Sequence, residues 1–493
     1  MSKKKEIFKQ IGIYSGSTQL AQLITLVAAI LSRRFLGPLQ TGIWSVLQII
    51  VDYSKYSTMG TMEVVTREIP YLIGKGEPAK AEKIKNIAFS FILSTSIFIA
   101  VCIALFSFLC RNFFSQEITY GLLSVSVLIV LQRINNLLIS LLRCYKKFEV
   151  EAGLMIVSAM VNAVLVAFLT YCFKIYGFIW AMILSFLFNI IYILWRFNFH
   201  FGWEYNGSEL KKIMSYGLPL MIIGVLMLGI RSADKIVIVK MAGFEVLGLY
   251  SIALMACSYV SNFSVSIAIV FLPHLQERIA LHKNIQELEG YLHKSSLTYV
   301  AIMPVLIGLV WIFAPVAIHF VLPKFILGIE AMKILSLSTF FVALTQPYQD
   351  LLIGLKKHMF LFPVLSFVLV LSFAVDYWVI HAGFGIMGVA AATSLIVLFN
   401  FSVIYFLATQ QYTDFRKAAI KYVHFVSFAV YFFFIFYALD RWATRSGNLV
   451  QTILFQTVIF IISYIPVLVI LNRELSIFTM LRQKISGLST KVS

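Results

Sequence analysis

Three basic residues interrupt otherwise apolar stretches, and these positions are suited to binding a charged ligand. Lys55, Arg133 and Arg231 each lie among hydrophobic neighbours. In mid-bilayer a lysine or arginine costs about 2.5–3.5 kcal/mol on insertion scales, so each requires a partner or a watery cavity. Arginine offers a planar fork of donors and lysine a compact charge, and both suit an anion such as phosphate. If the stretches span a membrane, the three cations predict an intramembrane anion site.

Acidic residues beside two of these cations leave a second interpretation open. Asp52 precedes Lys55 by three residues, and Asp234 follows Arg231 by three. Each pair could neutralise itself within one helical turn and serve only to join helices. Arg133 has no acidic neighbour within one turn, which favours a shared cavity that holds an anion. In that cavity the acids would position the cations or titrate.

Further polar residues in or beside apolar stretches extend the predicted site. Gln19 lies in a first stretch rich in hydrogen-bonding groups and Gln349 in a similar later one, so both are expected to line the cavity. Arg34 and Lys240 stand at the ends of two stretches, either as anchors that reach the membrane surface or as a basic exit vestibule. Asp376 joins the two acids above as a candidate for proton or sodium coupling.

Composition identifies the solvent as lipid. Hydrophobic residues make up 60% of the chain and charged residues 13%, and the mean hydropathy is +0.90, which polar surface could not cover in water. No GxxxxGK[ST] loop, nucleophile elbow or metal-ligand spacing is present. We therefore expect no enzyme, no catalytic residue, no metal and no cofactor. The net charge of +18 is attributed to loops that face anionic lipid rather than to nucleic acid.

About fourteen apolar stretches reach the roughly 20 residues that a helix needs to cross a bilayer. They predict an all-α membrane protein, with spans near 11–32, 41–62, 87–110, 118–141, 152–172, 175–195, 217–239, 246–272, 296–321, 331–353, 359–380, 384–408, 422–440 and 450–471. With a cytoplasmic N-terminus, the cytoplasmic segments carry roughly three times as many lysines and arginines as the external loops. This bias predicts a multi-pass protein of the cell (inner) membrane with both termini cytoplasmic.

An internal repeat organises these spans. Gly37–Ser45 (GPLQTGIWS) recurs as Gly243–Ser251 (GFEVLGLYS), and Leu141–Lys147 (LLRCYKK) as Leu351–Lys357 (LLIGLKK). Six spans per copy is an even number, so the copies are parallel repeats, whose interface near the midplane is a natural substrate site. The predicted domains are an N-terminal lobe at 1–200, a cytoplasmic linker at 201–216, a C-terminal lobe at 217–408, and two extra helices with a basic tail at 409–493.

Several segments of the chain resemble a known family. They are Arg33-Arg34-Phe-Leu-Gly37-Pro38, Gly42-Ile-Trp44-Ser45, Arg67-Glu68-Ile-Pro70, Gly74-Lys-Gly76, Gly217-Leu-Pro219, Asp234-Lys235 and Gly248-Leu-Tyr250-Ser251. The chain is similar to the polysaccharide-biosynthesis flippases of the multidrug, oligosaccharidyl-lipid and polysaccharide exporter superfamily. The resemblance implies a V-shaped exporter of six plus six helices with two extra ones. It also implies outward movement of polyprenyl-diphosphate-linked oligosaccharides by alternating access, with membrane lipid and glycan polymerases or glycosyltransferases as partners.

The predicted cavity and the implied substrate agree on an anionic headgroup. We hypothesise that Lys55, Arg133 and Arg231 hold the diphosphate and that polar groups of the first and tenth spans meet the sugars. Three alternatives stay open: a lipid II flippase, a cation-coupled multidrug exporter, which would prefer acids in its cavity, and a scaffold or polymerase subunit. Polymerases of this pathway usually carry a large external loop, which is not predicted here.

Overall fold

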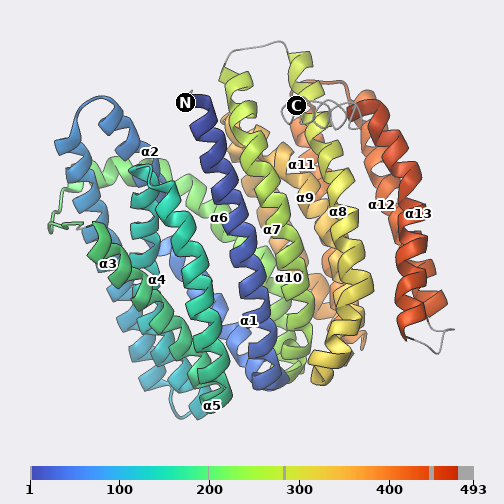
Figure 1. Cartoon of the computed structure of the whole chain (residues 1–493), viewed down its shortest axis with the longest axis horizontal. Coiled ribbons are helices and arrows are strands. Elements are labelled where there is room, and N and C mark those ends of the chain that lie inside the picture. Colours follow the sequence, from blue (N-terminus) through green and yellow to red (C-terminus); the bar gives the residue numbers. More distant parts are fainter. Residues whose placement is uncertain (1–2, 198, 281–284, 444–448, 476–493) are drawn as a thin grey trace, which may run out of the picture. The chain divides into compact units, whose positions relative to one another are not determined.

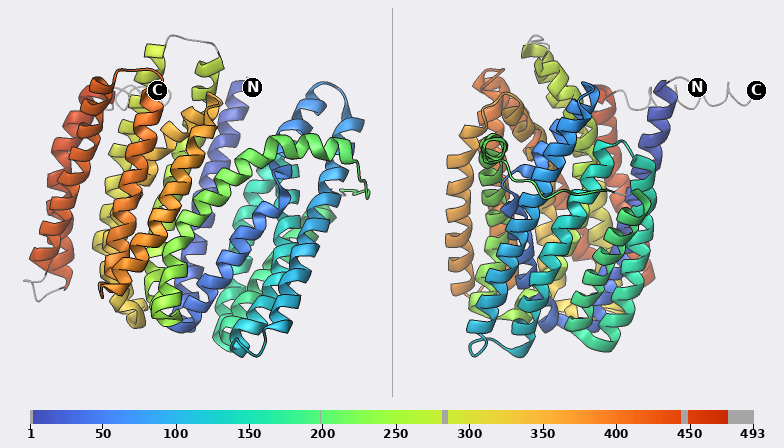
Figure 2. Two further views of the ribbon diagram at one scale, coloured as in Figure 1. Left: turned by 180° about the vertical axis from the view of Figure 1, so that it is seen from behind. Right: turned by 90° about the vertical axis from the view of Figure 1, so that its left-hand side faces the viewer.

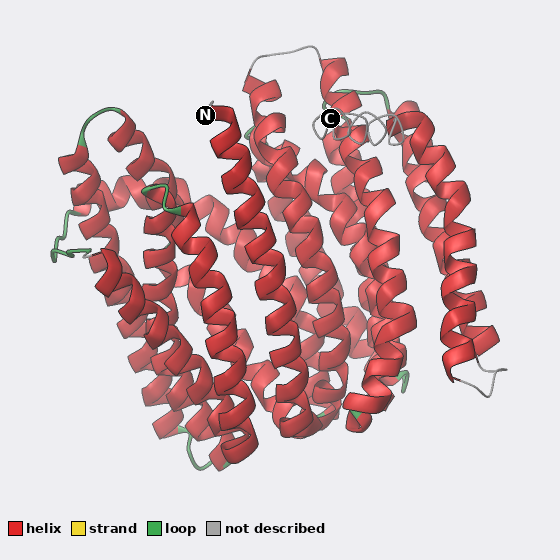
Figure 3. Cartoon of the chain, viewed as in Figure 1, coloured by secondary structure: helices red, strands yellow, loops and turns green. Residues whose placement is uncertain are grey.

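The computed structural model describes residues 3–197, 199–280, 285–443 and 449–475, and within these ranges the regular structure is helical (Figures 1 and 3). The elements are α1 (Lys3–Ser54), η1 (Lys55–Thr58), α2 (Thr61–Gly74), α3 (Pro78–Leu109), α4 (Gln116–Cys144), α5 (Phe148–Phe197), α6 (Gly207–Ala242), α7 (Phe244–Ala280), α8 (Ile285–Val321), η2 (Pro323–Gly328), α9 (Ile329–Gly354), η3 (His358–Phe360), α10 (Leu361–His381), α11 (Gly385–Thr409), α12 (Phe415–Ala443) and α13 (Leu449–Leu475).

The helices confirm the predicted all-α membrane fold. Eleven segments of the described residues are long and apolar enough to cross a bilayer. Two of them, Gly16–Thr58 and Phe148–Phe197, each contain two predicted spans, because α1 and α5 continue through kinks at Gly37 (φ 71°) and Lys174 (φ 54°). The predicted span 217–239 lies within α6. The protein is therefore a multi-pass membrane protein.

Backbone geometry confirms the internal repeat. Lys146 and Lys356 occupy equivalent positions in the matched segments, and both adopt φ 58°, a region that non-glycine residues rarely enter. Their amides donate to Arg143 O and Ile353 O, both at 3.0 Å. The matched glycines are also alike, since Gly37 has φ 71° and ψ 178° and Gly243 has φ 89° and ψ 176°. Both copies thus turn the chain in the same way.

The chain divides into two compact units, residues 1–248 and 249–493. In the first unit α1 packs mainly against α5, and α4 packs against α3 and α5. Its largest described apolar cluster includes Leu47 of α1, Leu128 of α4 and Ile179 of α5, all nearly fully buried. Helix α6 bends along its length (Figure 2) and contacts α1 and α2. Pro219 lies inside α6, and proline disrupts helical hydrogen bonding, which accounts for a bend.

In the second unit, a buried lysine joins the C-terminal helix pair to the rest. Lys333 Nζ of α9 lies 2.8 Å from Asp440 Oδ1 of α12 and 3.0 Å from Glu330 Oε1. The same ammonium lies 5.9 Å from the centre of the Trp311 ring of α8. Trp311 in turn stacks on Phe436 of α12 at 5.0 Å. The two helices beyond the repeat, α12 and α13, therefore pack against the other helices of the second unit.

The repeat-based domain limits and the compact units describe different divisions. The repeat places α6 in the second copy, whereas by contacts α6 belongs to the first unit. Part of the predicted linker 201–216 is bonded to α3, since Gly202 N donates to Asn86 Oδ1 (3.1 Å) and Glu204 N to Ser90 Oγ (2.9 Å). The domain limits stay a prediction, and the tail 476–493 lies outside the described residues.

Candidate anion-binding site

The first unit has an irregular turn where α1 ends, and α6 crosses it closely. After Ser54 the chain forms η1 and then two left-handed residues, Met59 (φ 47°) and Gly60 (φ 79°). A Cβ on Gly217 of α6 would lie 2.5 Å from Gly60 Cα, and one on Gly224 would lie 2.6 Å from the Tyr56 ring. Real Cβ atoms do not approach so closely. Glycines therefore allow α6 to lie directly against the segment that carries Lys55.

Arg133 of α4 is fixed to the same turn. Its side chain is buried, with 6% of the residue exposed. Nη2 donates to Val51 O (3.2 Å), Ser54 Oγ (3.2 Å) and Gln132 Oε1 (3.0 Å). Nε is buried and has no hydrogen-bond partner among the described residues. Arg133 therefore has a structural role at the end of α1, and part of its guanidinium keeps donor capacity.

Two exposed cations flank this buried arginine. Lys55 Nζ lies 4.9 Å from the centre of the Tyr56 ring, and both Lys55 and Arg231 of α6 are exposed. Lys55 lies close enough to Arg231 and Arg133 for their like charges to repel it. The three cations predicted from the sequence therefore gather around one place, contributed by η1, α4 and α6.

The carboxylate of Asp52 lies near these cations. Half-buried Asp52 interacts electrostatically with Lys235, Lys55, Arg133 and Arg231, in decreasing order. The ion pairs formed among the described residues do not include Asp52. Asp52 thus interacts with several cations and does not form an ion pair with Lys55 alone. We call Asp52, Lys55, Arg133, Arg231 and Lys235 the cation cluster.

Lys235 is the member of the cation cluster that sequence reasoning missed. It lies near the end of the predicted span 217–239 and inside α6, which continues to Ala242. The signal was present in the spacing, because Lys235 follows Arg231 by four residues and such residues share a helix face. Asp234 is buried, and its Oδ1 accepts a hydrogen bond from Lys235 N at 2.7 Å.

The other predicted site residues lie outside the cation cluster. Gln19 is half-buried in α1, and Arg34 and Lys240 are exposed in α1 and α6. Gln349 of α9 and Asp376 of α10 are buried in the second unit. The proposed roles of these residues in substrate binding or ion coupling stay predictions, as does the coupling role of Asp234.

The matched repeat motifs contact each other reciprocally within the first unit. A Cβ on Gly42 would lie 1.8 Å from Phe244 O, and a Cβ on the equivalent Gly248 would lie 1.8 Å from Pro38 O. Pro38 and Phe244 are themselves equivalent in the repeat. Arg34 and Lys240 each stand three residues before the matched glycine, on the helix ends that meet here. The contact is thus locally symmetric, with each glycine against the other motif's backbone.

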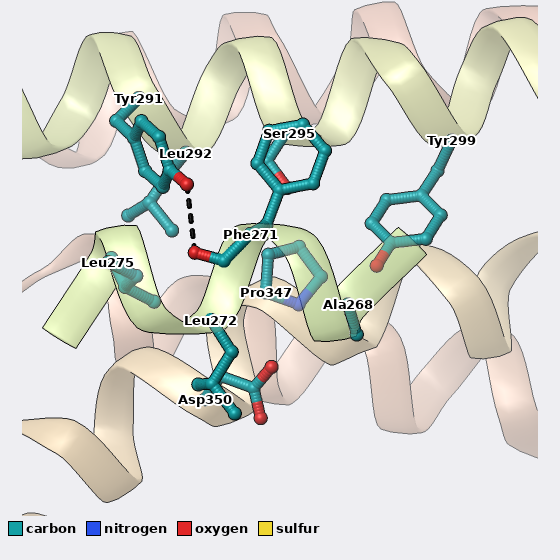
Figure 4. Close-up of a pocket in the computed structure, with 10 residues that line it drawn as sticks. All are labelled: Ala268, Phe271, Leu272, Leu275, Tyr291, Leu292, Ser295, Tyr299, Pro347 and Asp350. Atoms are coloured by element: carbon teal, nitrogen blue, oxygen red, sulfur yellow. Dashed lines mark hydrogen bonds between the residues drawn. The ribbon is translucent and has the colours of Figure 1, made fainter. Parts of the chain in front are cut away.

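The second unit contains a small, mostly apolar cavity between α7, α8 and α9 (Figure 4). Its volume is about 10 Å³, roughly enough for one water molecule. The Asp350 carboxylate and the Tyr299 hydroxyl point toward it in Figure 4, and Gln346 Nε2 donates to Asp350 Oδ1 at 3.0 Å. Ser295 also lines it, and its buried Oγ has no hydrogen-bond partner among the described residues.

Two adjacent serines of α8 give a matched test of this cavity. Ser295 and Ser296 are 1% and 0% exposed, but only Ser296 Oγ has a described bond, donated to Tyr348 Oη at 2.9 Å. We expect Ser296→Ala to lower the free energy of unfolding by about 1 kcal/mol, and Ser295→Ala to leave it unchanged or raise it, because no bond is lost. Thermal unfolding of the purified protein measures both. Equal losses would show that the Ser295 hydroxyl is bonded, for example to a water in the cavity.

Comparisons with known proteins agree on the fold. Lipid II flippase MurJ, in an inward closed conformation, superposes with a TM-score of 0.70 at 17% identity, covering 94% of this chain and 99% of that one. An inward-facing multidrug resistance MATE transporter gives 0.61 at 17% identity, covering 79% and 94%. A Pyrococcus furiosus transporter described as having a binding pocket of reverse polarity gives 0.59 at 17% identity, covering 82% and 95%. Comparison with curated protein sequences gave no significant match.

The chain therefore shares its fold with the MATE and Pyrococcus proteins, which are described as transporters of the MOP superfamily. The sequence model of one family, described as polysaccharide biosynthesis protein, matches residues 30–325. The chain belongs to this polysaccharide biosynthesis family. The matched range contains every residue of the cation cluster.

Proposed function

We propose that the protein is a flippase that moves a polyprenyl-diphosphate-linked oligosaccharide from the cytoplasmic to the outer leaflet by alternating access. The observation that carries this proposal is the cation cluster, in which four basic side chains interact electrostatically with the carboxylate of Asp52. Membership of a polysaccharide biosynthesis family supports a glycan as cargo. The structural likeness to a lipid II flippase supports a lipid-linked form of it.

The energetic problem that such a protein must solve matches the chemistry of the cation cluster. A diphosphate and several sugars crossing hydrocarbon would leave many polar groups unsatisfied, each at a cost of several kcal/mol. Exposed Lys55 and Arg231 offer charge to the phosphates, and Arg133 Nε offers a fixed donor beside them. Charge-assisted bonds of this kind are about twice as strong as neutral ones. The lipid tail can stay in the bilayer throughout.

The remaining parts of the proposal follow from the sequence. The protein acts in the cell membrane with both termini in the cytoplasm, because basic residues concentrate in the loops on that side. Polar groups such as Gln19 and Gln349 meet the sugars, and Arg34 and Lys240 form a basic exit. Asp234 and Asp376 are candidates for proton or sodium coupling. Glycosyltransferases that build the glycan and a polymerase that uses it are the proposed partners.

Charge separates this function from multidrug export. A pocket that captures cationic drugs should be acidic, whereas here four basic side chains interact with the carboxylate of Asp52. The Pyrococcus relative is described as having reverse pocket polarity and, on that ground, a different function, so polarity is a reasonable criterion within this superfamily. We therefore favour an anionic substrate.

Reconstitution into liposomes tests the proposal with three substrates presented separately. These are an undecaprenyl-diphosphate-linked oligosaccharide, lipid II and a fluorescent cationic drug. We expect the first to move between leaflets fastest, as measured by the fraction that becomes accessible to an added glycosidase, with protein-free liposomes as the blank. Faster movement of lipid II would favour a lipid II flippase, and movement of the drug alone would refute the assignment.

A further inference from the structure

Asp52 is the acidic member of the cation cluster. Its strongest electrostatic partner is Lys235 of α6, followed by Lys55 of η1, Arg133 of α4 and then Arg231 of α6. The carboxylate therefore interacts with cations of η1, α4 and α6, which are the elements that supply the basic residues of the cation cluster. Because Arg133 bonds to Val51 O and Ser54 Oγ on either side of it in the chain, Asp52 is held beside the guanidinium by geometry as well as by charge.

The cations have other contacts that keep Asp52 from closing a tight pair with one of them. Lys55 Nζ lies over the Tyr56 ring, and Arg133 Nη2 is bonded to the end of α1 and to Gln132. Asp234, the neighbouring acid, accepts from the backbone of Lys235. A shared, half-buried carboxylate of this kind offsets one of the positive charges of the group without saturating any one member.

We propose that Asp52 is an internal counter-anion that occupies the place of a substrate phosphate in the empty transporter and competes with the substrate for the same cations. This inference rests on the proposed function and adds how substrate is released. Asp52 offsets part of the positive charge of these cations between substrates, and uncompensated charge is costly in a membrane. With Asp52 in place, a bound diphosphate must share the cations with a fixed negative charge. Binding is thereby kept weak enough for release, as conduction through ion sites also requires.

Removing only the charge of Asp52 tests this proposal. Asp52→Asn keeps the shape of the side chain, so we expect it to bind inorganic pyrophosphate about tenfold or more tightly than the natural protein, because one like charge near the anion is lost. Titration calorimetry of the full chain in detergent, at one fixed salt concentration, measures the affinity. In liposomes the same variant should flip lipid-diphosphate glycan with a lower half-saturating concentration and a lower maximal rate, since release becomes slow.

Glu117→Gln is the matched control. It removes one negative charge from the same unit, but Glu117 accepts from Gln40 in the first turn of α4, 16 residues from Arg133 and hence about 24 Å away along the helix. The affinity of the Glu117→Gln variant for pyrophosphate should equal that of the natural protein. Unchanged or weaker binding by Asp52→Asn, or an equal gain in Glu117→Gln, would overturn the counter-anion role. The proposed function fails separately, if the natural protein does not flip the lipid-linked glycan.

Discussion

Lys55→Ala combined with Arg231→Ala should lower the rate of glycan flipping at least about 100-fold while the protein stays folded. Both residues are exposed, and the contact described for Lys55 is with its neighbour Tyr56. Hydrogen bonds to charged groups contribute about 1.5–3 kcal/mol each. Two such losses therefore exceed the 2.8 kcal/mol or so that corresponds to a factor of 100. The accessibility of the glycan to external glycosidase in liposomes measures the rate.

Lys75→Ala combined with Arg111→Ala is the control for charge. It removes one lysine and one arginine from the same unit, both exposed and both lying over aromatic rings, those of Tyr71 (4.7 Å) and Phe108 (5.1 Å). This variant should flip normally. Arg133 is left intact in both variants, because its bonds to α1 mean that its loss would also destabilise the fold. Normal flipping by the Lys55 and Arg231 double variant would contradict the proposed substrate site.

Gly42→Ala should destabilise the protein by about 3 kcal/mol and abolish flipping. The new Cβ would lie 1.8 Å from Phe244 O and 2.7 Å from Phe244 C. Both are backbone atoms, which cannot rotate away as a side chain would, so α1 and the start of α7 must separate. Overpacking typically costs about 1–3 kcal/mol, and this contact is at the severe end. Thermal unfolding and the liposome assay together measure the effect.

The same helix provides the control for this substitution. No atom lies within 4 Å of a Cβ placed on Gly16 of α1, and alanine favours a helix over glycine by up to about 1 kcal/mol. Gly16→Ala should therefore keep full activity and equal or greater stability. Gly248→Ala, at the equivalent position in the repeat, should behave like Gly42→Ala because its Cβ meets Pro38 O at 1.8 Å. A stable, active Gly42 variant would show that the motifs do not meet in the working protein.

Much of the fold could be predicted from the sequence because lipid imposes a simple rule on apolar length. Every predicted span lies mainly on a helix, although span 41–62 runs past the end of α1 into the turn at Met59 and Gly60. The duplication seen in Lys146 and Lys356 reappears as equal φ angles. The same rule placed separate spans on either side of Gly37 and of Lys174, where the structure has its kinks. Apolar length does not show that the helical backbone runs on to both kinks.

The site was predictable only where charge stands out against an apolar background. Lys55, Arg133 and Arg231 were found in this way, and the structure brings them together. Lys235 was missed because it lies near the end of an apolar stretch, and a lysine at such a position is usually assigned to the adjoining loop. The bonds of Arg133 to Val51 and Ser54 join residues about 80 positions apart. The close approach of Gly217 to Gly60 could not be predicted either, because a glycine in the sequence does not show which segment packs against it.

The most direct test of the account is an experimental structure of the full chain with an undecaprenyl-diphosphate-linked oligosaccharide bound. We predict that phosphate oxygens lie about 2.7–2.9 Å from nitrogen atoms of the cation cluster, the usual length for charge-assisted bonds. Asp52 should turn away from the cations that the phosphates then contact. A diphosphate bound elsewhere, with Asp52 unmoved among Lys55, Arg133, Arg231 and Lys235, would contradict the central claim.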